Sequence, residues 1–205
     1  MIVELSFIFF FSLASLYLLR KVAKIIGLVD KPNLRKQHQG VIPLVGGIAV
    51  FITLAQYIYN RPDTIPCSNL FLASIAVLTI LGAIDDRFDI SFKIRLVIQT
   101  LLTLFMMYFT GLELNSIGNI LGLGSLEFGM LAPVITVLAV LGAINAFNMI
   151  DGIDGLAGYV SLVALIAMSW LTWQSGDHAS LQVLLILAST VMTFLFFNRT
   201  RRNQT

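Results

Sequence analysis

The chain has 205 residues, of which 58% are hydrophobic and only 12% are charged, and its formal net charge is +2. An average soluble domain has about 45–50% apolar and about 25% charged residues, so this chain has too few polar residues to cover a water-facing surface. The composition excludes a soluble globular protein and predicts an integral membrane protein with one membrane domain over residues 1–205. A single cysteine, Cys67, excludes an internal disulfide.

Seven apolar runs follow one another, each comparable to the roughly 20 residues with which a helix crosses a bilayer. The runs fall at residues 2–19, 44–59, 70–84, 94–111, 131–147, 156–173 and 179–197, and the second and third are short. Helices are expected because lipid offers no partners to free backbone N–H and C=O groups. The sequence therefore predicts an all-α, polytopic membrane bundle of about seven transmembrane helices. The Gly-rich segment 112–130 is expected to form a small hairpin over the membrane surface.

The basic residues are distributed asymmetrically between these runs. All 13 Lys and Arg except Arg61 lie in segments 20–43 and 85–95 or after residue 197. The alternate connections carry Arg61 alone. Because cytoplasmic loops carry the excess of Lys and Arg, we expect the N-terminus outside and the C-terminus in the cytoplasm. The same assignment places on the cytoplasmic face Asp30, Asp85, Asp86, Asp89, Asp151 and Asp154.

The third run ends in an acidic segment, residues 85–89. Asp89 lies four residues after Asp85 and three after Asp86, so these carboxylates share a face if the helix continues by one turn. Like charges held together are costly unless a cation is present, and Mg²⁺ binds one or two carboxylates together with water and substrate phosphates. The alternative interpretation is a solvated helix end whose acids are neutralised by Arg87 and Lys93.

A second polar cluster follows the fifth run. Asn145, Asn148, Asp151 and Asp154 recur at three-residue spacing, and their oxygens are hard ligands of the type that Mg²⁺ takes. Glycines at the same interval allow close helix packing or the approach of a ligand to the backbone. Close packing is a sufficient explanation for Gly158, but it does not explain the four polar side chains.

The segment between the first two runs mixes cations with Pro and Gly. It is interpreted either as a basic loop attracted to anionic lipid head groups or as a phosphate clamp. The donors of such a clamp are Lys31, Arg35, Lys36 and His38. The pair Gly46-Gly47, at the start of the second run, either admits a ligand or packs closely on a neighbouring helix.

Four ordered segments carry a resemblance to a known family. They are residues 28–33, 42–47, 85–91 and 145–156. In these segments, and from about residue 17 to 197, the chain resembles the bacterial polyprenyl-phosphate sugar-1-phosphate transferases. The first segment, with Asp30, Lys31 and Asn33, is similar to the N-acetylglucosamine branch of that family and differs from the enzymes that act on UDP-muramoyl-pentapeptide.

The resemblance implies transfer of N-acetylglucosamine 1-phosphate from UDP-N-acetylglucosamine to undecaprenyl phosphate, with release of UMP. It implies a multi-pass protein of the bacterial inner (cytoplasmic) membrane, with membrane lipid around it. The implied reaction is the first step of enterobacterial common antigen or O-antigen lipopolysaccharide synthesis. The expected cofactor is Mg²⁺, with Mn²⁺ as an alternative. A homodimer is one expected assembly, and no nucleic-acid partner is expected.

The resemblance also implies roles for individual residues. Asp151 is the expected metal ligand, with Asp154 near it as a catalytic residue. Asp85 and Asp86 are expected to bind metal or to deprotonate the lipid phosphate, and which of them acts as the base is left open. The expected substrate-binding residues are Asp30, Lys31, Asn33, Arg35, His38, Asp89 and Asn148.

The chain departs from the family pattern after its last apolar run. Full-length members continue with further spans, a cytoplasmic Gly-Asp-Ala-Gly-Ser segment and a loop rich in His and Arg, which these 205 residues lack. The sequence thus predicts a C-terminal truncation with little or no turnover by this chain alone. The alternatives are an inactive remnant or non-catalytic membrane partner, and a small transporter. A transporter predicts acidic residues near mid-span, whereas these lie at span ends.

Overall fold

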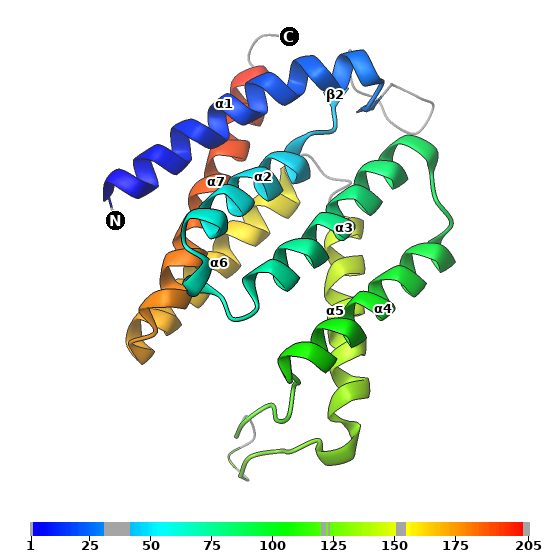
Figure 1. The fold of residues 1–205 in the computed structure, drawn as a ribbon, viewed down its shortest axis with the longest axis vertical. Helices are drawn as coiled ribbons and strands as arrows, with labels where there is room; N and C mark the ends of the chain where they lie inside the picture. The colour runs from blue at the N-terminus through cyan, green and yellow to red at the C-terminus, as the bar shows by residue number, and fades with distance from the viewer. Residues whose placement is uncertain (1, 31–41, 120–121, 123, 151–154, 203–205) are drawn as a thin grey trace. The chain divides into compact units, whose positions relative to one another are not determined.

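The computed structural model of the chain describes residues 2–30, 42–119, 122, 124–150 and 155–202 (Figure 1). The described residues contain seven α-helices, two short 3₁₀ helices and one two-stranded pairing, and they form two compact units. Unit 1 comprises residues 1–89 and 153–205, and unit 2 comprises residues 90–152. The single membrane domain expected from the sequence stays a prediction.

The helices confirm the all-α class. Unit 1 contains α1 (Ile2–Ile26), α2 (Gly46–Asn60), α3 (Ser68–Phe88), α6 (Leu156–Ser175) and α7 (His178–Arg202), and unit 2 contains α4 (Phe92–Thr110) and α5 (Ala132–Ile150). Within the described ranges, six helices are long and apolar enough to cross a membrane. The remaining helix, α2, has 15 residues and is about 22 Å long, against a hydrocarbon core of about 30 Å. A short second span agrees with the sequence.

Basic residues extend α1 beyond the first apolar run. Arg20, Lys21 and Lys24 lie in its last two turns, although the sequence places them in a connection. Lys and Arg are good helix formers, and their charge is favourable near a helix C-terminus. The helix ends before Gly27, whose φ of 74° belongs to the left-handed region that glycine adopts readily.

A short antiparallel pairing lies between α1 and α2. In it β1 (Val29–Asp30) is paired with β2 (Ile42–Pro43), with Val29 opposite Pro43 and Asp30 opposite Ile42. β1 packs against α3, and β2 packs against α1. The buried residues beneath this pairing form an apolar cluster of Leu16, Ala23, Leu28, Val45 and Ala49, with Ala83, Phe194 and Phe197 packed against it. The cluster therefore holds the pairing at the end of unit 1 where α3 finishes.

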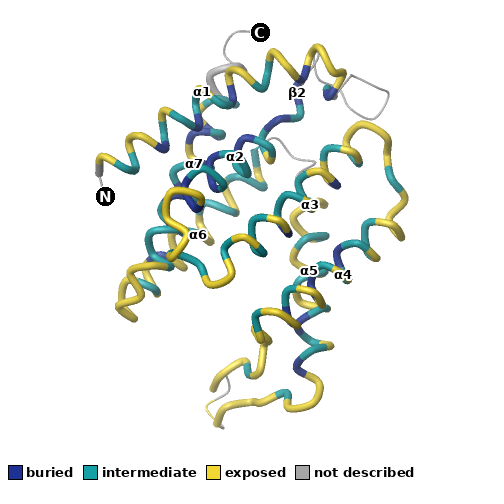
Figure 2. The backbone as a smooth tube through the Cα atoms, in the orientation of Figure 1, coloured by how far each residue is buried: buried dark blue, intermediate teal, exposed yellow. Residues whose placement is uncertain are grey.

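A second apolar cluster lies at the opposite end of unit 1. It joins α1, α2 and α7 through Ile8, Leu54, Tyr57, Ile58 and Ile186. The hydroxyl of Tyr57 donates to Oε1 of Gln182 at 3.2 Å, and an exposed ion pair of 2.6 Å joins Arg61 to Glu4. Figure 2 shows the buried residues of unit 1 gathered along α2 and α7. Helix packing in this unit therefore centres on α2 and α7.

Unit 2 is a pair of antiparallel helices joined by a hairpin. Ser116 and Glu127 form an isolated antiparallel bridge, which confirms the expected hairpin in the segment 112–130. The N–H of Leu114 donates to the hydroxyl of Thr136 at 2.8 Å, so the hairpin is attached to α5. The 3₁₀ helix η2 (Gly129–Leu131) then leads directly into α5.

Candidate functional site

The C-terminal end of α3 carries the first two expected catalytic residues. The helix runs to Phe88, so Asp85 and Asp86 lie in its last turn. Asp85 is half-buried and Asp86 is exposed. Because consecutive helical residues are about 100° apart around the axis, the two carboxylates leave the helix in different directions. The structure thus places both acids at the helix end, as the sequence predicts.

Asp89 does not continue the helix. It caps α3 in the left-handed region, with φ of 51° and ψ of 65°, and its N–H donates to the carbonyl of Asp85 at 2.8 Å. The face that Asp85 and Asp89 share in a longer helix is therefore not formed, and Asp89 is exposed. The guanidinium of Arg87, a cation of the alternative interpretation, lies 5.1 Å from the ring centre of Phe88.

The first connection lies at the same end of unit 1 as these acids. β1, whose second residue is Asp30, packs against α3. Ala83, two residues before Asp85, contacts the apolar cluster beneath the β pairing. In Figure 1 the end of α3 and the label of β2 appear at this same end of the unit. The described parts of three of the four segments that carry the resemblance therefore lie at the same end of unit 1.

Several expected site residues lie outside the described part of the chain. For Asp30 only the backbone is described. The others outside it are Lys31, Asn33, Arg35, His38, Asp151 and Asp154. Their roles stay predictions.

Two glycines near these segments have packing roles. A Cβ on Gly158 would lie 2.7 Å from Cδ2 of Leu195, so α6 packs closely on α7 as the sequence suggests. A Cβ on Gly46 would lie 2.6 Å from Cε2 of Phe194, so the start of α2 also packs closely on α7. Close packing therefore accounts for Gly46.

The second polar cluster is described in unit 2 as far as Ile150. Asn148 is exposed in the last turn of α5, and Asn145 is half-buried one turn earlier. Nδ2 of Asn145 donates to the carbonyl of Leu141 at 2.7 Å and lies 3.5 Å from Oε1 of Gln99 on α4. Sequence reasoning missed Gln99. Its signal was a lone glutamine inside an apolar run, because such side chains bond across helices in membranes.

The described donors fit Mg²⁺ in part. Asp85 and Asp86 supply two carboxylates at one helix end, and Mg²⁺ commonly combines one or two carboxylates with substrate phosphates. Among the described residues, no group of three His, Cys, Asp or Glu side chains could hold a metal. A complete site needs ligands from elsewhere in the chain or from substrate, which is the role expected of Asp151.

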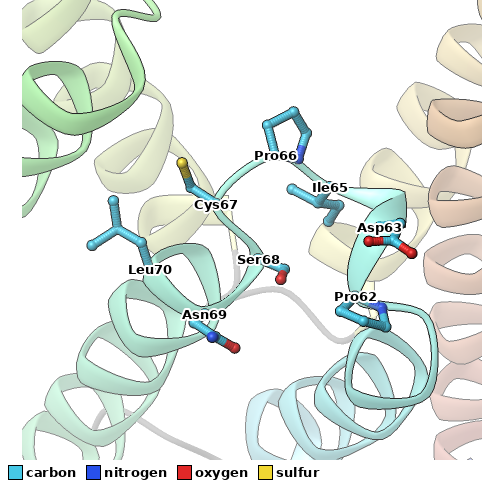
Figure 3. A pocket seen from close by; sticks show the side chains of 8 residues that line it. All are labelled: Pro62, Asp63, Ile65, Pro66, Cys67, Ser68, Asn69 and Leu70. Atoms are coloured by element: carbon cyan, nitrogen blue, oxygen red, sulfur yellow. The ribbon is translucent and has the colours of Figure 1, made fainter.

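A shallow pocket of about 550 Å³ lies at the other end of unit 1. Figure 3 shows its lining, which comes from residues 62–70, in the connection after α2 and the first turn of α3. Cys67 is a free, exposed cysteine in this lining, and Asp63 is the acid that lines it. No residue of the expected site lines this pocket, so it is separate from the acidic end of α3.

Residues 68–203 match the model of glycosyl transferase family 4. Since this range is more than half of the chain, the protein belongs to glycosyl transferase family 4. The matched range begins with α3 and includes Asp85, Asp86, Asp89, Asn148, Asp151 and Asp154. It starts after the first connection, so the resemblance of residues 28–47 stays a prediction.

Curated relatives share nearly half of the aligned residues with this chain. An undecaprenyl-phosphate alpha-N-acetylglucosaminyl 1-phosphate transferase from Yersinia pestis is 48% identical over 134 residues, which are 65% of this chain and 37% of the relative. The protein of the same name from Salmonella typhi is 48% identical over 65% of this chain and 36% of the relative. The one from Pasteurella multocida is 45% identical over 66% of this chain and 38% of the relative. The chain thus spans little more than a third of these relatives.

Proposed function

We propose that this chain carries part of the site that transfers N-acetylglucosamine 1-phosphate from UDP-N-acetylglucosamine to undecaprenyl phosphate, releasing UMP. The observation that carries the proposal is the match at 45–48% identity to transferases named for undecaprenyl phosphate and N-acetylglucosaminyl 1-phosphate. The acidic end of α3, inside the family match, supports it. The step begins enterobacterial common antigen or O-antigen lipopolysaccharide synthesis in the inner membrane.

In this reaction a phosphate oxygen of the lipid attacks the β-phosphorus of the UDP-sugar. A new P–O bond forms, and the bond from the β-phosphorus to the bridging oxygen breaks, so that UMP leaves with that oxygen. Both reactants are anionic, and phosphoryl transfer depends mainly on positioning and on neutralising charge. A bound Mg²⁺, or Mn²⁺ in its place, would supply that neutralisation.

The chain's own residues then have separate tasks. Asp151 would hold the metal with Asp154 near it, and either Asp85 or Asp86 would accept the proton of the lipid phosphate. Asp89 and Asn148 would bind substrate. The same role is proposed for the first connection, through Asp30, Lys31, Asn33, Arg35 and His38. The packing of β1 on α3 supports this assignment, because it brings the start of that connection to the acidic helix end.

The decisive assay gives the purified chain Mg²⁺, UDP-N-acetylglucosamine and undecaprenyl phosphate, and follows UMP release. Little or no turnover is expected of this chain alone. Any UMP release should depend on Mg²⁺ and should fall at least about 100-fold in Asp151→Asn, because even the outer-shell partners of a metal site are worth about 10–100-fold. Asp63→Asn is the matched control, because Asp63 is an exposed acid in the pocket at the other end of unit 1.

The control variant should keep UMP release within about twofold of the unmodified chain, as expected for a surface substitution away from such features. Failure of the unmodified chain to release UMP above the level of Asp151→Asn would show an inactive remnant of the family. Loss of release in Asp63→Asn as well would show that the assay reports folding and not the site.

The proposed sidedness has its own test in the native cysteine. Cys67 is exposed and lies in a connection that the charge distribution places outside. We expect a membrane-impermeant thiol reagent to label it when the outer face of the inner membrane is accessible. In a Cys67→Ser background, Lys93→Cys should be labelled only after the inner membrane is permeabilised. The reverse pattern would overturn the proposed orientation.

A further inference from the structure

The strongest unassigned feature of the molecule is an amide pair between the two helices of unit 2. Nδ2 of Asn145 on α5 lies 3.5 Å from Oε1 of Gln99 on α4 and 2.7 Å from the carbonyl of Leu141. The two hydrogens of one amide group thus have one acceptor within their own helix and one on the neighbouring helix. The orientation of Asn145 is therefore defined from two directions.

Gln99 is the residue that makes this contact specific. Only 4% of its surface is exposed, although it lies in a helix apolar enough to span a membrane. Apolar side chains gain little from association in lipid, so polar contacts and close packing hold such helices together. Thr103 is also buried on α4, but its described hydrogen bond stays within the helix, because its hydroxyl donates to the carbonyl of Gln99 at 2.8 Å.

The amide pair lies one turn from the end of α5 that carries Asn148. Residues three apart on a helix share a face, so Asn148 follows Asn145 toward the helix end. On α4 the residue four positions before Gln99 is Arg95, which is half-buried. Because α4 and α5 are antiparallel, Arg95 and Asn148 belong to the same end of unit 2. A change in the register of the two helices at Gln99 would shift Asn148 relative to α4.

We infer that Gln99 is a positioning residue. It fixes the register of α5 on α4 through Asn145, and it thereby places Asn148 for binding of the UDP-sugar. This inference rests on the proposed function, since Asn148 matters only if the site binds a nucleotide sugar. It assigns to Gln99 a task beyond helix association, with Asn145 as the residue through which it acts.

The test is a double-mutant cycle in the full chain reconstituted in nanodiscs. Gln99→Leu and Asn145→Leu remove each partner, and the two are then combined. The exchange Gln99→Asn with Asn145→Gln restores two amides at the same place with the same total length. Thr103→Val is the matched control, because it removes a buried hydroxyl of α4 that donates within its own helix, to the carbonyl of Gln99.

The first readout is binding of UDP-N-acetylglucosamine in the presence of Mn²⁺. We expect Gln99→Leu and Asn145→Leu each to weaken binding about 10-fold, as for loss of an outer-shell partner, while the double variant is no weaker than either single one. The exchange variant should recover most of the affinity, and Thr103→Val should lie within about twofold of the unmodified chain. Equal affinities of Gln99→Leu and Thr103→Val would overturn the inference.

The second readout needs no substrate. In a Cys67→Ser background, the pair of substitutions Arg95→Cys and Asn148→Cys should give a disulfide across α4 and α5 under mild oxidation. Gln99→Leu should slow its formation several-fold, and Thr103→Val should not. If the unmodified chain binds no UDP-sugar, the proposed function fails, and the cross-linking rate alone tests whether Gln99 fixes the register of α5 on α4. Equal rates with Gln99, Gln99→Leu and Thr103→Val would then overturn that role of Gln99.

Discussion

α3 in unit 1 and α4 in unit 2 end in the same backbone conformation but with different residues. Gly111 ends α4 with φ of 66°, and its N–H donates to the carbonyl of Met107 at 2.8 Å. Asp89 ends α3 with φ of 51°, and its N–H donates to the carbonyl of Asp85, also at 2.8 Å. Glycine adopts this conformation readily, whereas it costs most other residues about 1–2 kcal/mol and costs aspartate, which adopts it more often than they do, less. Folding alone favours the end of α4 and disfavours the end of α3.

Electrostatics makes the same distinction. Asp89 joins Asp85 and Asp86 at a helix C-terminus, where the helix dipole favours cations. By contrast, Asp177 immediately precedes the first residue of α7, and its Oδ1 accepts the N–H of Ser180 at 3.1 Å. An acid thus stabilises the start of α7, whereas the helix dipole opposes acids at the end of α3. Backbone strain such as that of Asp89 gathers at functional sites, which supports the roles proposed for the acidic segment.

The largest effect expected from this comparison comes from placing an aspartate at the end of α4. Gly111→Asp should destabilise the protein by about 1–2 kcal/mol, because the left-handed conformation is then strained and a negative charge faces the helix dipole. A Cβ at this position meets no atom within 4 Å, so no clash contributes. Thermal unfolding in detergent micelles measures the loss. Gly111→Asn should lose less stability, because asparagine tolerates this conformation better and carries no charge. Equal losses in the two variants would show that the negative charge does not contribute.

The reciprocal change is expected to have the opposite sign. Asp89→Gly should stabilise the protein by about 1 kcal/mol, since it relieves the left-handed strain and removes one of three like charges. It should also lower UDP-sugar binding about 10-fold if Asp89 contacts substrate through a charged hydrogen bond. Asp89→Asn separates the two causes, because it keeps a side chain and removes the charge. A more stable variant with unchanged binding would remove Asp89 from the site.

Much of the fold followed from composition, because apolar runs of these lengths must be helical in lipid. The positions of Asp85 and Asp86 at a helix end followed from the same runs. The cap at Asp89 did not, because several residues can end a helix and the path of the chain decides between them. The contact of Gln99 with Asn145 also escaped prediction, since it depends on which faces of α4 and α5 meet.

The first connection shows the same limit in another form. The sequence placed Asp30 on the cytoplasmic face, but it did not indicate the pairing of β1 with β2, which joins residues 12 to 14 positions apart. Nor did it indicate the packing of β1 on α3, which joins residues at least 38 positions apart. Spacing along the chain does not encode such contacts. Asp177, at the start of α7, shows a more local form of the same limit. Its bond to Ser180 gives it a titration that can be measured.

The smallest expected effect is the pH dependence of that bond. The side chain of Ser180, followed by its backbone N–H, lowers the pKa of Asp177 below its ordinary value of 3.8. A carboxyl whose folded pKa is lowered stabilises the protein fully above the unfolded value, and this contribution is lost as the pH falls through the folded pKa. The difference in unfolding midpoint between the unmodified chain and Asp177→Asn should therefore be constant from about pH 7 to 5 and should change only below pH 3.8. A difference that changed between pH 5 and 7 would assign the titration to another group.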